Sequence, residues 1–158
     1  MTQPWRVFGP GQGEIRHLRP PARSGTVTIV VDPENAGSRR LAMGHQHLGP
    51  GGVIPMHLHE RQDEILIVQD GEAVISLEDR RLPAPAGTTV FVPEGVWHGV
   101  ENSGGGILHL IWIITPPGLE EMFRGISAPP GAERRPLTSD DFVALARRHG
   151  MLVRPADT

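Results

Sequence analysis

The apolar residues of this chain fall in short runs of roughly 5 to 8 residues, rich in valine and isoleucine, with turn-forming residues between them. Glycine occurs 20 times and proline 16 times, spread among the runs and not gathered in one block. Pro85-Ala86-Gly87 and the segment 103–106 are such turns. The pattern predicts an all-β sandwich or barrel, with strands over 26–31, 40–47, 64–68, 73–77, 88–92 and 107–114.

One turn has a more specific signature. Asp70-Gly71 stands between the runs 64–68 and 73–77, and this dipeptide is typical of tight β-hairpins. We therefore expect these two runs to pair as a hairpin.

The period of the apolar residues changes after Pro116-Pro117-Gly118. Apolar residues then recur at helical spacing, first over 119–126 and again over 142–149. Thr138 or Ser139 is the expected N-cap of the second helix, and Gly150 its stop. We expect two amphipathic helices that cover an apolar flank of the barrel; the alternative is that they close one of its mouths.

The size and charge of the chain bound its partners. A chain of 158 residues fits one domain, and a net charge of −3 favours neither nucleic acid nor an anionic membrane as partner. The longest apolar run, 107–114, is far shorter than the ~20 residues that span a bilayer. Residues 1–25 lack the apolar segment of a secretion signal, so the expected location is the cytoplasm.

Three residue types are missing, and their absence removes whole classes of chemistry. The chain has no lysine, cysteine or tyrosine. A lysine Schiff base, a thiolate nucleophile, a disulfide, an iron–sulfur cluster and a tyrosine acid are therefore excluded.

The segment 52–65, GVIPMHLHERQDEI, contains the densest set of metal-ligating side chains. Successive side chains of a strand alternate between its faces, so His57 and His59 point to the same side. Glu64 joins them only if the chain bends within 60–63, which is polar and suited to a bend. His98 follows the turn Pro93-Glu94-Gly95, which can aim it at the same place.

Two spaced motifs carry a family resemblance. The first is Gly51-x5-His57-x-His59-x4-Glu64-x6-Gly71, and the second is Gly87-x5-Pro93-x-Gly95-x2-His98-x3-Asn102. Both resemble the paired motifs of the cupin superfamily at every position, and the 116–126 tail, PPGLEEMFRGI, is similar to that of small bacterial cupins grouped with quercetinase-like dioxygenases.

The resemblance implies an antiparallel jelly-roll barrel in which His57, His59, Glu64 and His98 bind a metal. Gly71, Gly87, Gly95 and Asn102 would serve turns, and a homodimer is expected. The expected layout is an arm over 1–25 packed on the barrel or a partner subunit, the barrel over 26–117, and a helical extension of the same domain over 118–158.

Three imidazoles and one carboxylate suit several divalent ions. We expect one transition metal per chain, Fe(II) before Ni, Mn, Co, Cu or Zn. The resemblance implies an oxygenase that uses dioxygen on an enolic or phenolic small molecule, with Glu64 as catalytic base. The alternatives are a non-redox cyclase, isomerase or dehydratase of natural-product biosynthesis, or a module that only binds a ligand.

Further residues near these motifs have less certain roles. His45 and His47 are expected to face solvent or another subunit, and His109 to be a hydrogen-bonded core residue. Trp97 and Trp112 are expected to pack and not to contact substrate. Gln62 and Asp63 are expected in a solvated turn, with ligand orientation as the alternative.

Overall fold

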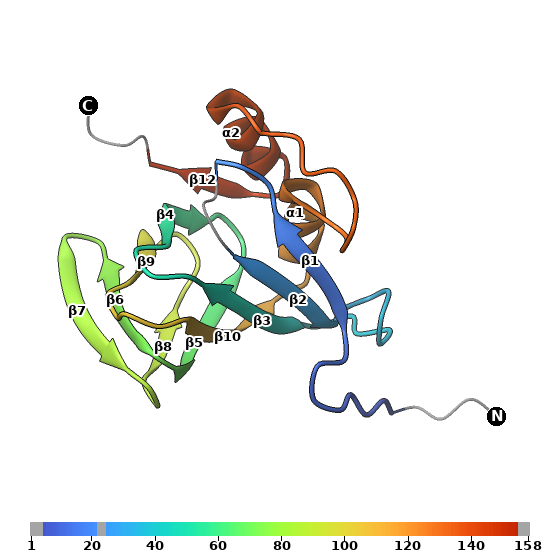
Figure 1. Ribbon diagram of the computed structural model, residues 1–158, viewed down its shortest axis with the longest axis horizontal. Helices are drawn as coiled ribbons and strands as arrows, with labels where there is room; N and C mark the ends of the chain where they lie inside the picture. The colour runs from blue at the N-terminus through green and yellow to red at the C-terminus, as the bar shows by residue number, and fades with distance from the viewer. Residues whose placement is uncertain (1–4, 22–24, 155–158) are drawn as a thin grey trace.

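The computed structural model describes residues 5–21 and 25–154, which fold into two facing antiparallel sheets with two helices beside them (Figure 1). Residues 1–4 and 22–24 of the predicted arm lie outside the described residues. The larger sheet contains, in spatial order, β11 (Ser127–Ala128), β1 (Glu14–Leu18), β2 (Thr26–Val31), β3 (Ala42–Leu48), β10 (Leu108–Thr115), β5 (Asp63–Asp70) and β8 (Thr89–Val92). The smaller sheet contains β12 (Met151–Val153), β4 (Val53–His59), β9 (His98–Asn102), β6 (Glu72–Leu77) and β7 (Arg80–Pro85).

This arrangement is the predicted all-β jelly roll, and each of the six predicted runs is a strand. Buried and less buried residues alternate along β3 and β10, as expected for strands with one face on a core. The inward side chains of the two sheets form that core, where Trp112, Ile114 and Leu110 are among the most buried.

The predicted hairpin at Asp70-Gly71 is wrong. β5 belongs to the larger sheet and β6 to the smaller one, so the chain crosses between the sheets at Gly71. Gly71 has φ 90°, and a Cβ there would lie 3.0 Å from the Ile107 carbonyl oxygen. The glycine is needed for this crossing, which uses the same left-handed backbone that a hairpin turn would use.

The two predicted helices form close to their expected bounds. α1 spans Leu119–Ile126 and α2 spans Ser139–Arg148. Thr138 is the N-cap of α2, and its side chain forms a reciprocal capping box with Asp141. α1 packs on the barrel core, where the ring centroid of Phe123 lies 5.1 Å from that of Trp112.

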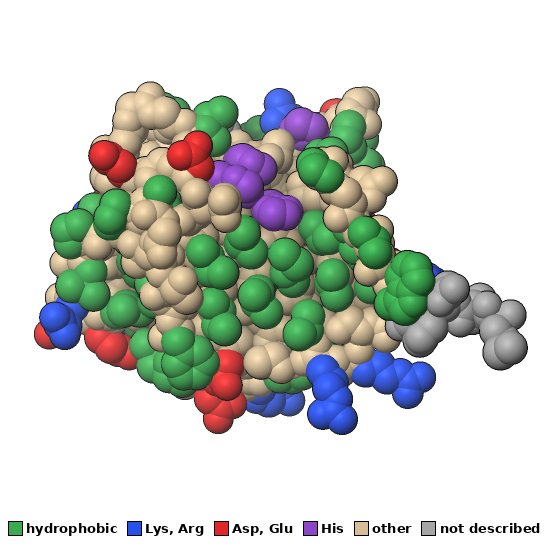
Figure 2. All heavy atoms as spheres, turned by 90° about the horizontal axis from the view of Figure 1, so that it is seen from below, with side chains coloured by type: hydrophobic (Ala, Val, Ile, Leu, Met, Phe, Trp, Pro, Cys, Tyr) green, Lys and Arg blue, Asp and Glu red, His purple; other side chains and the backbone are tan. Residues whose placement is uncertain are grey.

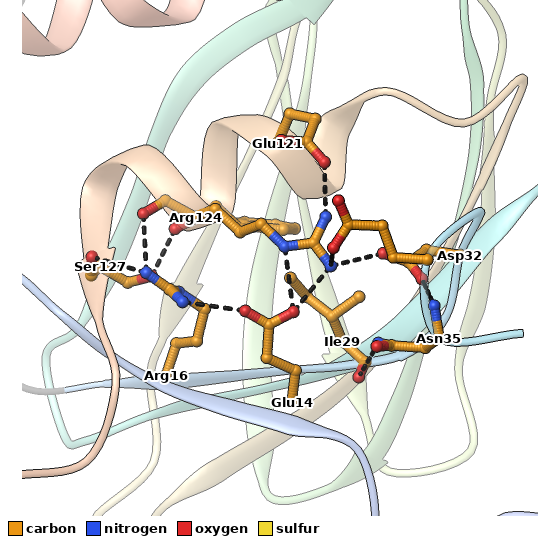
Figure 3. A network of polar contacts seen from close by, with 10 residues as sticks. Glu14, Arg16, Ile29, Asp32, Asn35, Glu121, Arg124 and Ser127 are labelled. Carbon is orange, nitrogen blue, oxygen red and sulfur yellow. Dashed lines mark hydrogen bonds and ion pairs between the residues drawn. The ribbon is translucent and has the colours of Figure 1, made fainter.

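An arginine network fixes α1 to the larger sheet (Figure 3). The Arg124 guanidinium donates to Glu14 of β1 at 2.7 Å and to Asp32, just after β2, at 2.6 Å. Arg16 of β1 donates to the Arg124 carbonyl and to the Ser127 side chain at the end of the helix. Charge-assisted hydrogen bonds from Arg124 and Arg16 thus hold the C-terminal part of α1 against β1 and the end of β2.

The segment after α1 also adds two short strands. β11 pairs with β1, and β12 pairs with β4 through Met151 opposite His59 and Val153 opposite His57. Within the described ranges, no helix is long and apolar enough to cross a membrane.

Candidate metal centre

Three strands bring the predicted ligands together inside the barrel. His57 and His59 point inward from β4, and His98, the first residue of β9, lies directly opposite His57 in the strand register. Glu64 points inward from β5 of the facing sheet. The site therefore bridges the two sheets.

The bend that brings Glu64 round is held by two hydrogen bonds. The Glu60 backbone N–H donates to the Gly150 carbonyl at 2.8 Å, and the Gln62 side chain donates to the Pro116 carbonyl at 2.8 Å. Gln62 is 8% exposed, so the expected solvated turn is wrong for this residue. Asp63 caps the Glu94 backbone N–H at 3.1 Å. Gln62 and Asp63 thus shape the bend through backbone contacts.

The four side chains offer donor atoms that all lie within 4.8 Å of one another. Glu64 Oε2 lies 2.9 Å from His98 Nε2 and 3.3 Å from His59 Nε2. All four residues are buried, with exposed fractions between 0% and 6%. In the described part of the chain this is the one group of three or more such residues that converges this closely.

Backbone carbonyls set the orientation of two of the imidazoles. His57 Nδ1 lies 2.8 Å from the Pro55 carbonyl oxygen, and His98 Nδ1 lies 3.0 Å from that of Val96. Because a carbonyl only accepts, each Nδ1 carries the proton and donates it. Nε2 of each ring therefore points into the cluster, as in metal-ligating histidines.

Burial and mutual charge set the protonation of the cluster. Burial, reinforced by His98 and His59, lowers the pKa of His57 to about 3. Burial alone would raise the pKa of Glu64, but hydrogen bonds from His59 and His98 outweigh it and hold that pKa well below its usual range. At neutral pH the cluster therefore offers a neutral imidazole and an ionised carboxylate, which are the ligand forms.

The donor set fits a divalent transition metal ion. His59 Nδ1 is buried and has no hydrogen-bond partner among the described residues, a costly arrangement in a purely structural cluster. Because His98 donates through Nδ1, its contact with Glu64 requires a second ring proton, consistent with a raised pKa. Burial lowers the pKa of His98, and the hydrogen bond and charge of Glu64 more than reverse that. A bound cation can replace this proton and satisfy the carboxylate.

The glycines and the asparagine of the two motifs occupy turns. Gly71, Gly87 and Gly95 all have φ between 78° and 90°, a conformation that glycine adopts without strain. The Asn102 side chain donates to the Leu48 and Gly106 carbonyls and accepts from the Gly104 backbone N–H. These residues position the loops at the ends of the ligand-bearing strands.

Three other candidate residues, all histidines, lie on the outer face of the larger sheet and not with the cluster. His109 is not a core residue: it is half-buried on the outer face of the larger sheet, because the inward positions of β10 are Leu108, Leu110, Trp112 and Ile114. His45 and His47 share that outer face. Trp112 packs in the core, and its indole N–H has no partner within the described ranges. The guanidinium carbon of Arg154 lies over the Trp97 ring, 4.7 Å from the centroid of that ring.

Two surface cavities also lie elsewhere. One of about 340 Å³ is lined by Arg19 and residues of α2, and one of about 290 Å³ is lined by His17 and the 129–134 loop. Neither is lined by any of the four candidate ligands.

Comparisons with known proteins agree with this geometry. The cupin domain family matches residues 44–114, which include all four candidate ligands. The tetracenomycin polyketide synthase protein TcmJ of Streptomyces glaucescens is 24% identical over 94 residues, which are 60% of this chain and 63% of that protein. The match thus spans less than two thirds of that relative.

Solved structures show the same fold. A structure described as a predicted oxalate decarboxylase from Thermotoga maritima has a TM-score of 0.62 at 22% identity, covering 71% of this chain and 100% of the other. The polyketide cyclase RemF from Streptomyces resistomycificus has a TM-score of 0.60 at 20% identity, covering 90% and 91%. The part of the two-sheet barrel that carries both spaced motifs, residues 44–114, is therefore a cupin domain.

Proposed function

We propose that this protein is a metal-dependent enzyme that cyclises an enolisable, polyketide-type small molecule without a change of oxidation state. The observation that carries the proposal is the position of Glu64. Its Oε2 faces His59 and His98, whereas Oε1 has no hydrogen-bond partner among the described residues. This carboxylate is ionised at neutral pH, because its pKa is lowered, and the available oxygen can accept a proton from a substrate.

The reaction requires only proton transfers and one new carbon–carbon bond. Glu64 Oε1 removes a proton from a methylene group between two carbonyls. The resulting carbanion attacks a second carbonyl carbon of the same molecule, and the oxygen of that carbonyl takes up a proton. This attack closes the ring. The alcohol that it leaves then departs as water with a hydrogen of the adjacent carbon, which forms a carbon–carbon double bond, so no oxidant or reductant is needed.

The other three residues of the cluster hold and orient. His57, His59 and His98 are the proposed ligands, together with Glu64, and the carbonyls of Pro55 and Val96 fix two of the rings. A divalent ion in this donor set supplies Lewis acidity toward a carbonyl oxygen. Burial of all four side chains excludes bulk water, which favours ring closure over competing hydrolysis.

The relatives support a non-redox assignment. The names of TcmJ and RemF connect those proteins with polyketide synthesis and polyketide cyclisation, respectively. We extend that chemistry to this chain as part of the proposal.

The test uses purified, metal-loaded protein and a synthetic linear tetraketone with carbonyls on alternate carbons, in which the proposed attack closes a six-membered ring. We expect a product lighter by one water, with no uptake of dioxygen. Glu64→Gln should lower the rate by about 10²- to 10⁴-fold. Glu60→Gln, an exposed acid in the adjacent bend, is the matched control and should keep full activity. Retention of activity by Glu64→Gln would contradict the role of Glu64.

An oxygenase is the second candidate, supported by the composition of the donor set. His57, His59, Glu64 and His98 would hold a divalent ion through three imidazoles and one carboxylate, and an ion with six coordination positions would have two left for a substrate oxygen and dioxygen. Fe(II) is the metal expected for that reaction. Oxygen consumption with an enol or flavonol, and a product that gains oxygen atoms from labelled dioxygen, would select this candidate over the cyclase.

The expected homodimer also stays a prediction, which light scattering tests.

A further inference from the structure

Three histidines outside the candidate metal centre form a cluster of their own. His45 and His47 alternate along β3 with inward-facing buried residues, and His109 does the same on β10. All three therefore project from the outer face of the larger sheet, away from the barrel interior. Figure 2 shows histidine side chains gathered beside a broad hydrophobic face.

The strand register sets their spacing. β3 and β10 are antiparallel, with His47 directly opposite His109 and His45 opposite Ile111. The rings of His47 and His109 stack with centroids 4.3 Å apart. His45 is the diagonal neighbour, and its Nδ1 lies 2.9 Å from His109 Nε2.

This nitrogen–nitrogen separation is also that of two neighbouring ligands on one ion. Metal–imidazole bonds of about 2.0–2.1 Å place two nitrogens ~2.9 Å apart when they meet at a right angle, as in octahedral or square-planar sites, and ~3.3 Å apart at the tetrahedral angle. Without metal, one of the two nitrogens donates a proton to the other. On metal binding, that proton moves to the second nitrogen of the same ring, so both lone pairs face the ion and no proton is lost.

The electrostatic surroundings favour ligand binding. Burial lowers the pKa of His45, His47 and His109, and the neighbouring histidines lower those of His45 and His109 further. Neutral imidazole is the form that binds metal. Asp70 lies opposite His109 on β5, and its negative charge raises the pKa of His109, against the effect of burial. Asp70 is therefore the carboxylate on the neighbouring strand that could add an oxygen ligand.

We propose that His45 and His109 form the preset half of a second divalent-metal site, which His47 and Asp70 complete. The site takes an ion that imidazole and carboxylate favour, such as Zn(II), Ni(II) or Cu(II). His47 must turn out of its stack on His109 to contribute. The inner cluster needs no such rearrangement, so the outer site is the weaker one and fills second.

Zinc stoichiometry tests the proposal directly. Wild-type protein is titrated with Zn(II) by calorimetry, and its metal content is measured after equilibrium dialysis. We expect two Zn(II) per chain, bound in two resolved steps. His45→Ala and His109→Ala should each reduce this to one by removing the weaker step. His149→Ala, at the end of α2, is the matched control and should keep both.

Two further measurements separate the outer site from the inner one. Glu64→Gln should lose the tighter step and keep the weaker one. The second measurement is NMR of the wild-type protein, which does not depend on any variant folding. The ring resonances of His45 and His109 should shift with the second equivalent of Zn(II) and not with the first. A single step that His109→Ala leaves unchanged, or second-equivalent shifts confined to other histidines, would overturn the proposal.

Discussion

Asp32 is fully buried, and its Oδ2 lies 2.6 Å from a guanidinium nitrogen of Arg124. The two residues connect the end of β2 to α1, which packs on the barrel core beside Trp112. A carboxylate so completely removed from water depends on its partner for compensation. This ion pair is therefore one of the contacts that hold α1 on the sheet.

Removing Arg124 should be strongly destabilising. Arg124→Ala leaves the Asp32 charge buried without its guanidinium, and we expect the free energy of unfolding to fall by about 3–5 kcal/mol in urea titrations. Arg135→Ala breaks the ion pair between Arg135 and Glu133, in which both side chains are exposed. It should change the free energy of unfolding by less than about 0.5 kcal/mol. Equal effects of the two changes would contradict the importance of burial.

Glu14 should make the stability of the protein depend on pH. Burial alone would raise the pKa of Glu14, but hydrogen bonds from Arg124 and Arg16 outweigh it and hold that pKa below its usual value of 4.5. The folded state therefore gains stability above pH 4.5 and loses it as the pH falls through the lowered pKa. We expect Glu14→Gln to be less stable than wild type at neutral pH, with the difference shrinking below pH 4.5. Denaturant titrations across the pH range measure it, and a constant difference would show that Glu14 does not titrate differently on unfolding.

Gly44 should not tolerate a side chain. A Cβ at this position of β3 would lie 2.0 Å from the Thr28 carbonyl oxygen and 2.5 Å from Cζ2 of Trp112. Gly44→Ala should destabilise the protein by about 1–3 kcal/mol or more, because neither the hydrogen-bonded backbone of β2 nor the packed indole of Trp112 can move away easily. Gly105→Ala has open space around its Cβ and should be close to neutral. Thermal unfolding of the two variants side by side is the measurement.

Metal binding at the inner site should stabilise the fold. An ion that binds only the folded state adds about 2.7 kcal/mol when its free concentration is 100 times the Kd. We expect one equivalent of Zn(II) to raise the Tm of the wild type, and His98→Ala to lose most of that rise. His149→Ala should respond as the wild type does. An unchanged Tm in the wild type would argue against the four residues as ligands.

The strands and the shared face of His57 and His59 were predictable from spacing, whereas the convergence of Glu64 and His98 with them was implied by the resemblance of the two motifs to those of cupins. Strand alternation places the first two on one face, and a polar bend returns Glu64 to them. Their role as metal ligands remains a prediction. The bend itself depends on the carbonyls of Gly150 and Pro116, which are distant in sequence and give no local signal.

The face occupied by His109 was not predictable from its own strand. Both faces of β10 are apolar, since Ile111 and Ile113 alternate with Leu110 and Trp112. Only the register against β3 and β5 shows which set faces the core. The edge strand β7 gave no signal either, because its sequence RRLPAP contains two prolines, which an edge strand tolerates.

The pairing of β12 with β4 makes assembly of the ligand-bearing strand a late event during translation. Among the residues that the structure describes, 151–153 supply the only neighbour on one side of the strand that carries His57 and His59. A ribosome that has synthesised all four candidate ligands has therefore not yet released the segment that completes their sheet. Until that segment emerges, the strand has an open edge, which a chaperone or a neighbouring nascent chain can occupy.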